Sequence, residues 1–184
     1  MLNNIQRRTY TDIEKRGICG SSLRSLPIFR KKDIHQTVPR ALKNEEDFSL
    51  SIVIPILHRL GFSDIRYNHG KREFGKDIVF SRKTEFDYFE FWGAQVKCGD
   101  VYGKANSEID EIIAQIDDAF KVPLYDLYTK QRERISKLLI VISGRFTENA
   151  IEKICEKIEN NALRNNLIFI DGEKIGALGS RLRS

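Results

Sequence analysis

Apolar residues recur at helical spacing in three parts of the chain. The first run extends from Phe48 to Gly61, which is a favourable C-terminal stop, and it follows the acidic step Asn44–Asp47. Pro55 falls inside this run and is expected to kink or divide the helix. A second amphipathic helix is predicted over 107–120, and a third is predicted from an N-cap at Thr147 to about residue 159.

Between these helices the pattern changes to that of β-strands. A short strand is expected near 65–67, and two more lie within residues 75–98, which read GKDIVFSRKTEFDYFEFWGAQVKC. The unbroken apolar runs 138–142 and 167–170 are typical of strands buried on both faces. Residues 124–134 are predicted to form a short helix. The resulting order, α-β-β-β-α-(α)-β-α-β, predicts a three-layer α-β-α core with a mixed central sheet.

The first 44 residues show no sustained periodicity and carry an uneven charge. They hold ten lysines and arginines against three acids, a balance of +7, whereas the whole chain has a formal net charge of +5. The remaining residues therefore carry −2. We predict an irregular basic arm over 1–44 and a folded domain over 45–184. Such an arm suits either a polyanionic partner such as DNA or a role as a solvated leader.

Composition limits the class of protein. The chain has 184 residues, of which 41% are hydrophobic and 31% charged, and this is typical of a globular protein. No apolar run is long enough for a membrane span, and no apolar segment follows the N-terminal arginines as in a secretory signal. The three cysteines are widely spaced, so we expect free thiols in the cytoplasm and no disulfide framework or zinc site.

Polar residues occupy unusual positions in the two strands of 75–98. Gln95 and Lys97 are two residues apart, so their side chains share one face of the strand. If the two strands form an antiparallel hairpin, Asp77 at the start of one comes close to Gln95 and Lys97 at the end of the other. A carboxylate and an amide oxygen can hold Mg²⁺ (or Mn²⁺) together with a phosphate and waters. The lysine can position the attacking water or offset charge on the phosphate.

These motifs resemble those of the PD-(D/E)xK nuclease superfamily. Gly75-Lys76-Asp77 matches its acid at the start of the second strand, and Gln95-Val96-Lys97 matches the Q-x-K variant of its third-strand motif. The resemblance covers roughly residues 45–145. It is strongest to the Mrr-like restriction endonucleases and the archaeal-type Holliday-junction resolvases.

The resemblance implies a restriction-endonuclease-like fold and a Mg²⁺-dependent endodeoxyribonuclease that acts in restriction or other defence against foreign DNA. It also implies the possibility of a homodimer, because many relatives dimerise to cut both strands. Two alternatives stay open. One is a nuclease-fold DNA-binding or structural module without the chemistry, and the other is a structure-specific nuclease of DNA repair or recombination.

Members of the superfamily usually carry a further glutamate on the first helix. Here Phe48 is followed by Ser49, and the nearest acids are Glu45, Glu46 and Asp47. Either the helix begins sooner and Glu46 or Glu45 reaches the metal, or this ligand is absent. Of these acids we take Glu46 as the candidate catalytic and metal-binding residue, beside Asp77, Gln95 and Lys97.

Candidate DNA contacts come from basic residues near the site and in the arm. The turn before Asp77 supplies one group, and its backbone and cations suit phosphate binding, although a plain hydrophilic turn explains it as well. The basic arm supplies the other group. The predicted contacts are His69, Lys71, Arg72, Lys76, Arg30, Lys31 and Lys32. Gln115, on the helix after the QxK motif, either leans toward the site or occupies an ordinary exposed position.

Overall fold

The computed structural model describes residues 42, 44–68, 74–104, 106–126 and 130–182. The predicted basic arm, except Leu42 and Asn44, therefore lies outside the described residues, and so do His69, Lys71, Arg72 and Arg30–Lys32. The described residues include the first predicted helix and, apart from the gaps just given, the predicted folded domain.

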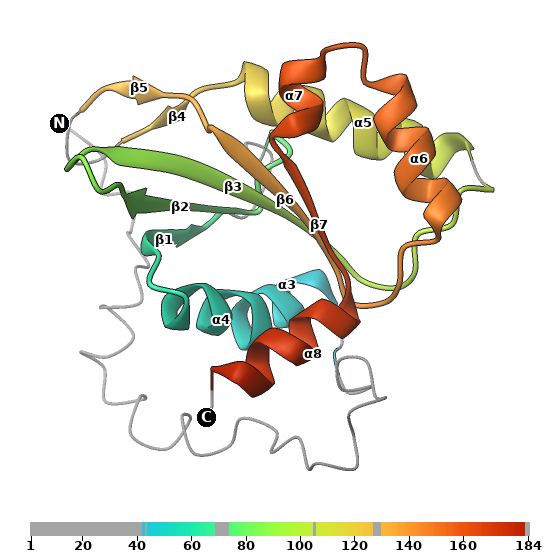
Figure 1. Cartoon of the computed structure of the whole chain (residues 1–184), viewed down its shortest axis with the longest axis horizontal. Coiled ribbons are helices and arrows are strands. Elements are labelled where there is room, and N and C mark those ends of the chain that lie inside the picture. Colours follow the sequence, from blue (N-terminus) through green and yellow to red (C-terminus); the bar gives the residue numbers. More distant parts are fainter. Residues whose placement is uncertain (1–41, 43, 69–73, 105, 127–129, 183–184) are drawn as a thin grey trace, which may run out of the picture.

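A mixed five-stranded sheet with the order β1-β2-β3-β6-β7 forms the centre of the molecule (Figure 1). The first three strands pair antiparallel, and β6 and β7 run parallel to β3. The expected antiparallel hairpin is present in the register that sets Ile78 opposite Ala94. The strands are β1 (Ser63–Tyr67), β2 (Ile78–Lys83), β3 (Phe89–Lys97), β6 (Lys137–Ile142) and β7 (Leu167–Ile170).

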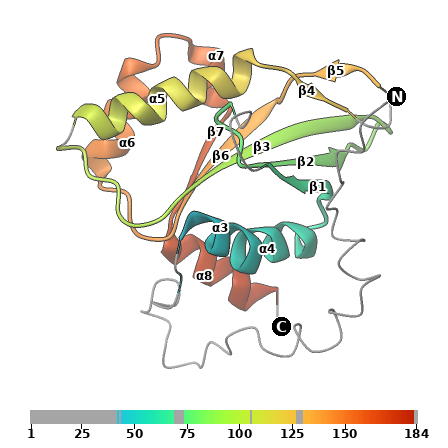
Figure 2. The ribbon, with the colours of Figure 1, turned by 180° about the vertical axis from the view of Figure 1, so that it is seen from behind.

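One face of the sheet is covered by the first helical segment and the last helix. The segment consists of α3 (Glu45–Phe48), the π-helical turn η2 (Ser49–Val53) and α4 (Ile54–Arg59), and the last helix is α8 (Gly172–Arg181). Phe48 and Ile175 pack with strand residues such as Phe80 and Val96 in one hydrophobic cluster. The other face is covered by α5 (Asn106–Lys121), α6 (Glu148–Lys157) and α7 (Asn161–Asn165). Figure 2 shows the same separation from behind.

The predicted irregularity at Pro55 takes the form of a π-turn. Proline has no backbone N–H to donate, and the N–H of Ile54 reaches back five residues to the carbonyl of Ser49. Pro55 then lies in the first turn of α4, where a missing donor costs nothing. The helix therefore continues through this position as two α-helical parts joined by a π-helical turn. Ser49, the first residue of that turn, is buried. π-turns of this kind occur often at functional sites.

The three-layer α-β-α core with a mixed sheet is confirmed, and the structure corrects three local predictions. The described residues of the predicted helix over 124–134, which are 124–126 and 130–134, are not helical. They contain the two-stranded β4 (Leu124–Tyr125) and β5 (Arg132–Glu133), because Asp126 pairs its backbone with Gln131 and Arg66 donates to the carbonyl of Tyr125. The strand β7 lies at the sheet edge and is only partly buried. Helix α8 was not predicted. Within the described residues no helix has the length and apolarity needed to cross a membrane.

Candidate active site

Asp77 directly precedes β2. The neighbouring strand β3 extends beyond the start of β2, to Lys97. The preceding turn has positive φ at Phe74 (45°) and Gly75 (69°), so the chain reverses sharply before the strand. The Oδ2 atom of Asp77 accepts a hydrogen bond of 2.6 Å from the backbone N–H of Val96. This N–H lies between Gln95 and Lys97, so the Asp77 carboxylate is fixed against the middle of the QxK motif, as the hairpin prediction required.

The side chains of Gln95 and Lys97 point from β3 toward α5. Gln95 is only 3% exposed, and its Nε2 donates to Oε1 of Gln115. Lys97 Nζ donates to Oε1 of Glu111 at 2.9 Å, and the Gln115 side chain donates to the same carboxylate at 3.4 Å. The prediction that Gln95 and Lys97 share a face is confirmed by these bonds to one helix. The structure also favours the first of the two readings of Gln115, because this residue contacts the candidate site.

The backbone of α5 approaches the Asp77 turn closely. A Cβ atom at Gly75 would collide with the backbone carbonyl oxygen of Gln115. Glycine is therefore required at position 75 for both its conformation and its size. Through this contact, the turn that carries Asp77 and the helix that binds Gln95 are packed directly together.

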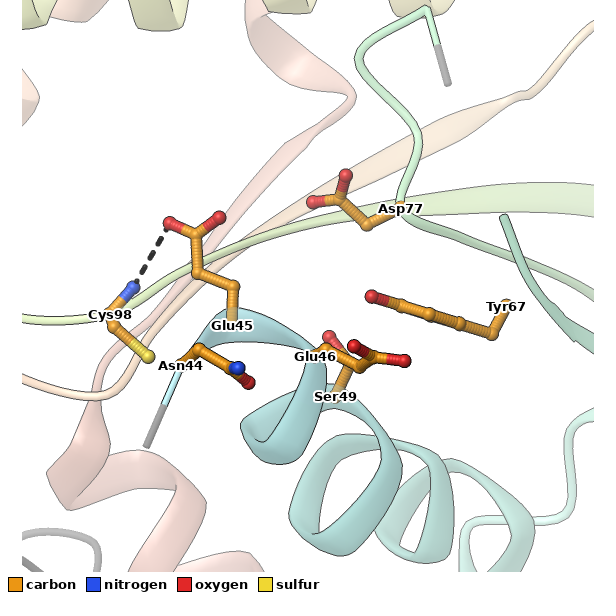
Figure 3. Close-up of a pocket in the computed structure, with 7 residues that line it drawn as sticks. All are labelled: Asn44, Glu45, Glu46, Ser49, Tyr67, Asp77 and Cys98. Atoms are coloured by element: carbon orange, nitrogen blue, oxygen red, sulfur yellow. Dashed lines mark hydrogen bonds between the residues drawn. The ribbon is translucent and has the colours of Figure 1, made fainter. Parts of the chain in front are cut away.

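A second group of side chains approaches Asp77 from the opposite side of the sheet end. They line an open pocket of about 400 Å³ between α3 and the strand ends (Figure 3). The lining residues are Asn44, Glu45, Glu46, Ser49, Tyr67, Asp77 and Cys98. The structure therefore brings Asp77 and Glu46 to one pocket, whereas Gln95 and Lys97 are not among its lining residues.

The first helix begins sooner than its apolar pattern indicated. Asn44 caps it by accepting a hydrogen bond of 2.8 Å from the backbone N–H of Asp47, so Glu45 and Glu46 belong to the first turn. The helix therefore begins sooner, as the first of the two alternatives for the missing glutamate requires. Glu45 also accepts a long bond of 3.4 Å from the backbone N–H of Cys98, just beyond β3. Figure 3 shows its carboxylate directed toward the strand ends, and the Glu46 carboxylate lying nearer Tyr67.

Ionic contacts set the charge state on the α5 side of the site. Hydrogen bonding and attraction from Lys97 hold the pKa of Glu111 below its usual value, so Glu111 is a carboxylate at neutral pH. At the pocket, burial raises the pKa of the Cys98 thiol, and the nearby Glu45 and Asp47 add to this effect. Cys98 is therefore a protonated, poorly nucleophilic thiol at neutral pH.

Lys76 is placed differently from the sequence prediction. It is only 3% exposed, and its ammonium donates to the backbone carbonyls of Phe74 (3.3 Å), Ala119 (3.0 Å) and Val122 (3.0 Å). Burial lowers the pKa of Lys76 to about 8, with Asp118 opposing the change, so at pH 7 the group still has three protons for its three acceptors. The assignment of Lys76 to DNA contacts is therefore wrong, because its ammonium binds carbonyl oxygens at the C-terminal end of α5 and does not face solvent.

Replacing Lys76 with methionine is expected to lower the free energy of unfolding by about 3 kcal/mol, because buried carbonyls would lose a charged donor. Urea unfolding monitored by circular dichroism measures this loss. Lys83→Met is the matched control, since its ammonium pairs with Asp87 on an exposed surface and such pairs contribute about 1 kcal/mol at most. Equal stability of the two variants would contradict the proposed role of Lys76.

Two oxygen atoms at this end of the sheet are of the kind that binds a small, hard cation. The Oε1 atom of Gln95 is buried and has no hydrogen-bond partner among the described residues, while its amide nitrogen is bound. Such an oxygen is suited to a cation, and the carboxylate of Asp77 is fixed on the adjacent peptide. In the described part of the chain no three His, Cys, Asp or Glu residues form a group that could hold a metal. Mg²⁺ is usually bound by one or two carboxylates together with waters and substrate phosphates.

No protein-family model and no curated protein matches the chain. Two solved structures are similar to it in their backbone. One is the restriction endonuclease FokI bound to DNA, with 13% sequence identity and a TM-score of 0.47 over 97% of this chain and 33% of that chain. The other is the MspJI restriction endonuclease in complex with a 27-mer oligonucleotide, with 11% identity and a TM-score of 0.39 over 99% of this chain and 35% of that chain. The chain thus spans about a third of the length of each of these proteins.

Proposed function

We propose that the protein is a metal-dependent DNA endonuclease of the Mrr-like type that hydrolyses phosphodiester bonds in defence against foreign DNA. The observation that supports this most is the buried Oε1 of Gln95, which has no hydrogen-bond partner among the described residues and lies on the strand that binds the Asp77 carboxylate. A buried carbonyl oxygen without a partner costs about 1–3 kcal/mol, and coordination of a cation would offset this cost.

In this proposal Asp77, Gln95 and an acid of α3 hold Mg²⁺ or Mn²⁺. When bound, the cation polarises the phosphodiester and lowers the pKa of a water molecule. Lys97 offsets the negative charge that develops on the phosphate and orients the attacking water. Glu111 keeps the Lys97 ammonium beside the strand end, and the Lys97 side chain is 19% exposed. Of the two acids in the pocket, Glu45 is the better candidate ligand because it is bonded to the end of β3.

The direct test incubates the full-length protein with plasmid, linear, single-stranded and four-way-junction DNA, in Mg²⁺, Mn²⁺ or excess chelator. We expect cleavage that requires the metal and stops with chelator. Cleavage restricted to the junction would replace the defence role with one in repair or recombination. An absence of metal-dependent cleavage on every substrate would contradict the nuclease proposal.

A second candidate function is a DNA-binding module that has the nuclease fold without catalysis. The salt bridge of Lys97 with Glu111 favours it, and so does the lack of a three-acid group among the residues that the structure describes. The basic segment 1–44 would then supply phosphate contacts, and binding would weaken steeply with salt. Salt-sensitive DNA binding without cleavage in any metal would support this module.

The two α3 acids provide a matched pair of variants. Glu45→Gln is expected to reduce cleavage by about 10–100-fold, because it removes charge from the candidate metal position while the amide oxygen still accepts from Cys98. Glu46→Gln makes the same chemical change one residue away and is expected to have a much smaller effect. Initial rates of plasmid nicking measure both. A larger loss in Glu46→Gln would assign the role to Glu46.

A further inference from the structure

Four polar side chains form a continuous chain between β3 and α5. Gln95 donates to Gln115, Gln115 donates to Glu111, and Lys97 donates to the same Glu111 oxygen. Glu111 and Gln115 are four residues apart in α5, so they lie one turn apart on the same face. Each link in this chain has a direction, because each bond has a defined donor and acceptor.

The direction is set by Glu111. A carboxylate accepts hydrogen bonds and cannot donate them, so Gln115 must present its NH₂ group to Glu111. The carbonyl oxygen of Gln115 is then left for Gln95, which must answer with its own NH₂ group. Gln95 Oε1 is consequently the atom that remains without a partner in a buried position. If the side-chain amide of Gln115 were turned so that its NH₂ group faced Gln95, Gln95 would bind it through Oε1. The NH₂ group of Gln95, which repels cations, would then occupy the position without a partner.

We propose that Glu111 and Gln115 are positioning residues that orient the Gln95 amide so that its oxygen, and not its nitrogen, is offered to the metal. This inference rests on the proposed nuclease function. Neither residue contacts the cation in this arrangement, and both act through Gln95. The close packing of Gly75 against the Gln115 backbone keeps α5 at the distance that this hydrogen-bond chain requires.

The test measures Mn²⁺ binding to the full-length protein by isothermal titration calorimetry, together with kcat and KM for plasmid cleavage at several Mn²⁺ concentrations. Glu111→Gln leaves an acceptor for Lys97 but no longer specifies the direction of the two amides. Gln115→Met removes the acceptor for Gln95 at similar volume. We expect both variants to bind Mn²⁺ about 10–100-fold more weakly, with KM for DNA nearly unchanged and kcat recovered at high Mn²⁺.

Glu108→Gln is the matched control, because it makes the same isosteric change in the first turn of the same helix and lies outside the hydrogen-bond chain. Mn²⁺ affinities of Glu111→Gln and Gln115→Met equal to that of Glu108→Gln, in a wild-type protein that binds Mn²⁺ and cleaves DNA, would overturn this inference and leave the nuclease proposal standing. A wild-type protein that neither binds Mn²⁺ nor cleaves DNA would overturn both.

Discussion

Replacing Asp77 with asparagine is expected to reduce metal-dependent DNA cleavage by on the order of 10³-fold. Asp77 is the anion fixed at the middle of the QxK motif, and Gln95 beside it is neutral, so its charge is a large part of the attraction for a cation. Cleavage rates over a range of Mn²⁺ concentrations, with Mn²⁺ binding measured in parallel, test this. Both the rate and the Mn²⁺ affinity should fall.

The same variant should fold normally, because asparagine retains an oxygen that can accept from the Val96 N–H. The bond becomes neutral and loses about 1 kcal/mol, which urea unfolding can measure. Asp87→Asn, at the far end of the β2–β3 hairpin, makes the same change where the carboxylate is exposed and pairs with Lys83. Cleavage by Asp77→Asn at the rate of Asp87→Asn would exclude Asp77 from the chemistry.

The position of Asp77 against the QxK segment was predictable because it depends on local periodicity. Side chains two residues apart in a strand must share a face, and an antiparallel hairpin must bring its first and last residues together. The sequence therefore predicts that Asp77, Gln95 and Lys97 converge. In the structure the Asp77 carboxylate binds the backbone N–H between Gln95 and Lys97, and the side chains of these two residues point toward α5. The sequence does not indicate which side chains of α5 Gln95 and Lys97 contact. The apolar pattern of α5 fixes its buried face only approximately, so the rotation of the helix about its axis stays open. Glu111 was missed for this reason, although its four-residue spacing from Gln115 on a polar stripe was a usable signal.

The start of the first helix was less predictable because a cap decides it. The apolar period begins at Phe48, but the side chain of Asn44 extends the helix back to Glu45. That extension places two acids, Glu45 and Glu46, in the lining of the pocket. An asparagine followed by three acids is itself an N-terminal signal.

Tertiary contacts account for the elements that the pattern misjudged. The predicted helix over 124–134 had no sustained apolar face to bury, and short helices need such a face to be stable. The bond from Arg66 to Tyr125 and the β4–β5 pairing stabilise an extended conformation there instead. Helix α8 has glycines at positions 172, 176 and 179, which lower its intrinsic propensity. It forms because Asp171 caps it and Ile175 is buried against the sheet. Local propensity alone therefore favours the opposite assignment in both places.

Replacing Lys97 with methionine is expected to lower kcat by about 10²–10³-fold while leaving Mn²⁺ affinity nearly unchanged. In the proposed mechanism Lys97 acts on the phosphate and the water, whereas the metal ligands are other residues. Glu111 still accepts from Gln115 without Lys97, so the orientation of Gln95 is preserved. Single-turnover cleavage at saturating Mn²⁺, together with calorimetric Mn²⁺ binding, separates the two effects.

Loss of the salt bridge does not complicate this test. The Glu111 side chain is 60% exposed, and exposed ion pairs contribute about 1 kcal/mol or less to stability. Lys97→Arg provides the matched control for charge, since arginine can keep the ion pair and the attraction for DNA but changes the shape of the donor. We expect Lys97→Arg to bind DNA as the wild type does and to cleave slowly. Wild-type kcat in Lys97→Met would remove Lys97 from the mechanism, and a decrease confined to Mn²⁺ affinity would instead make it part of the metal site.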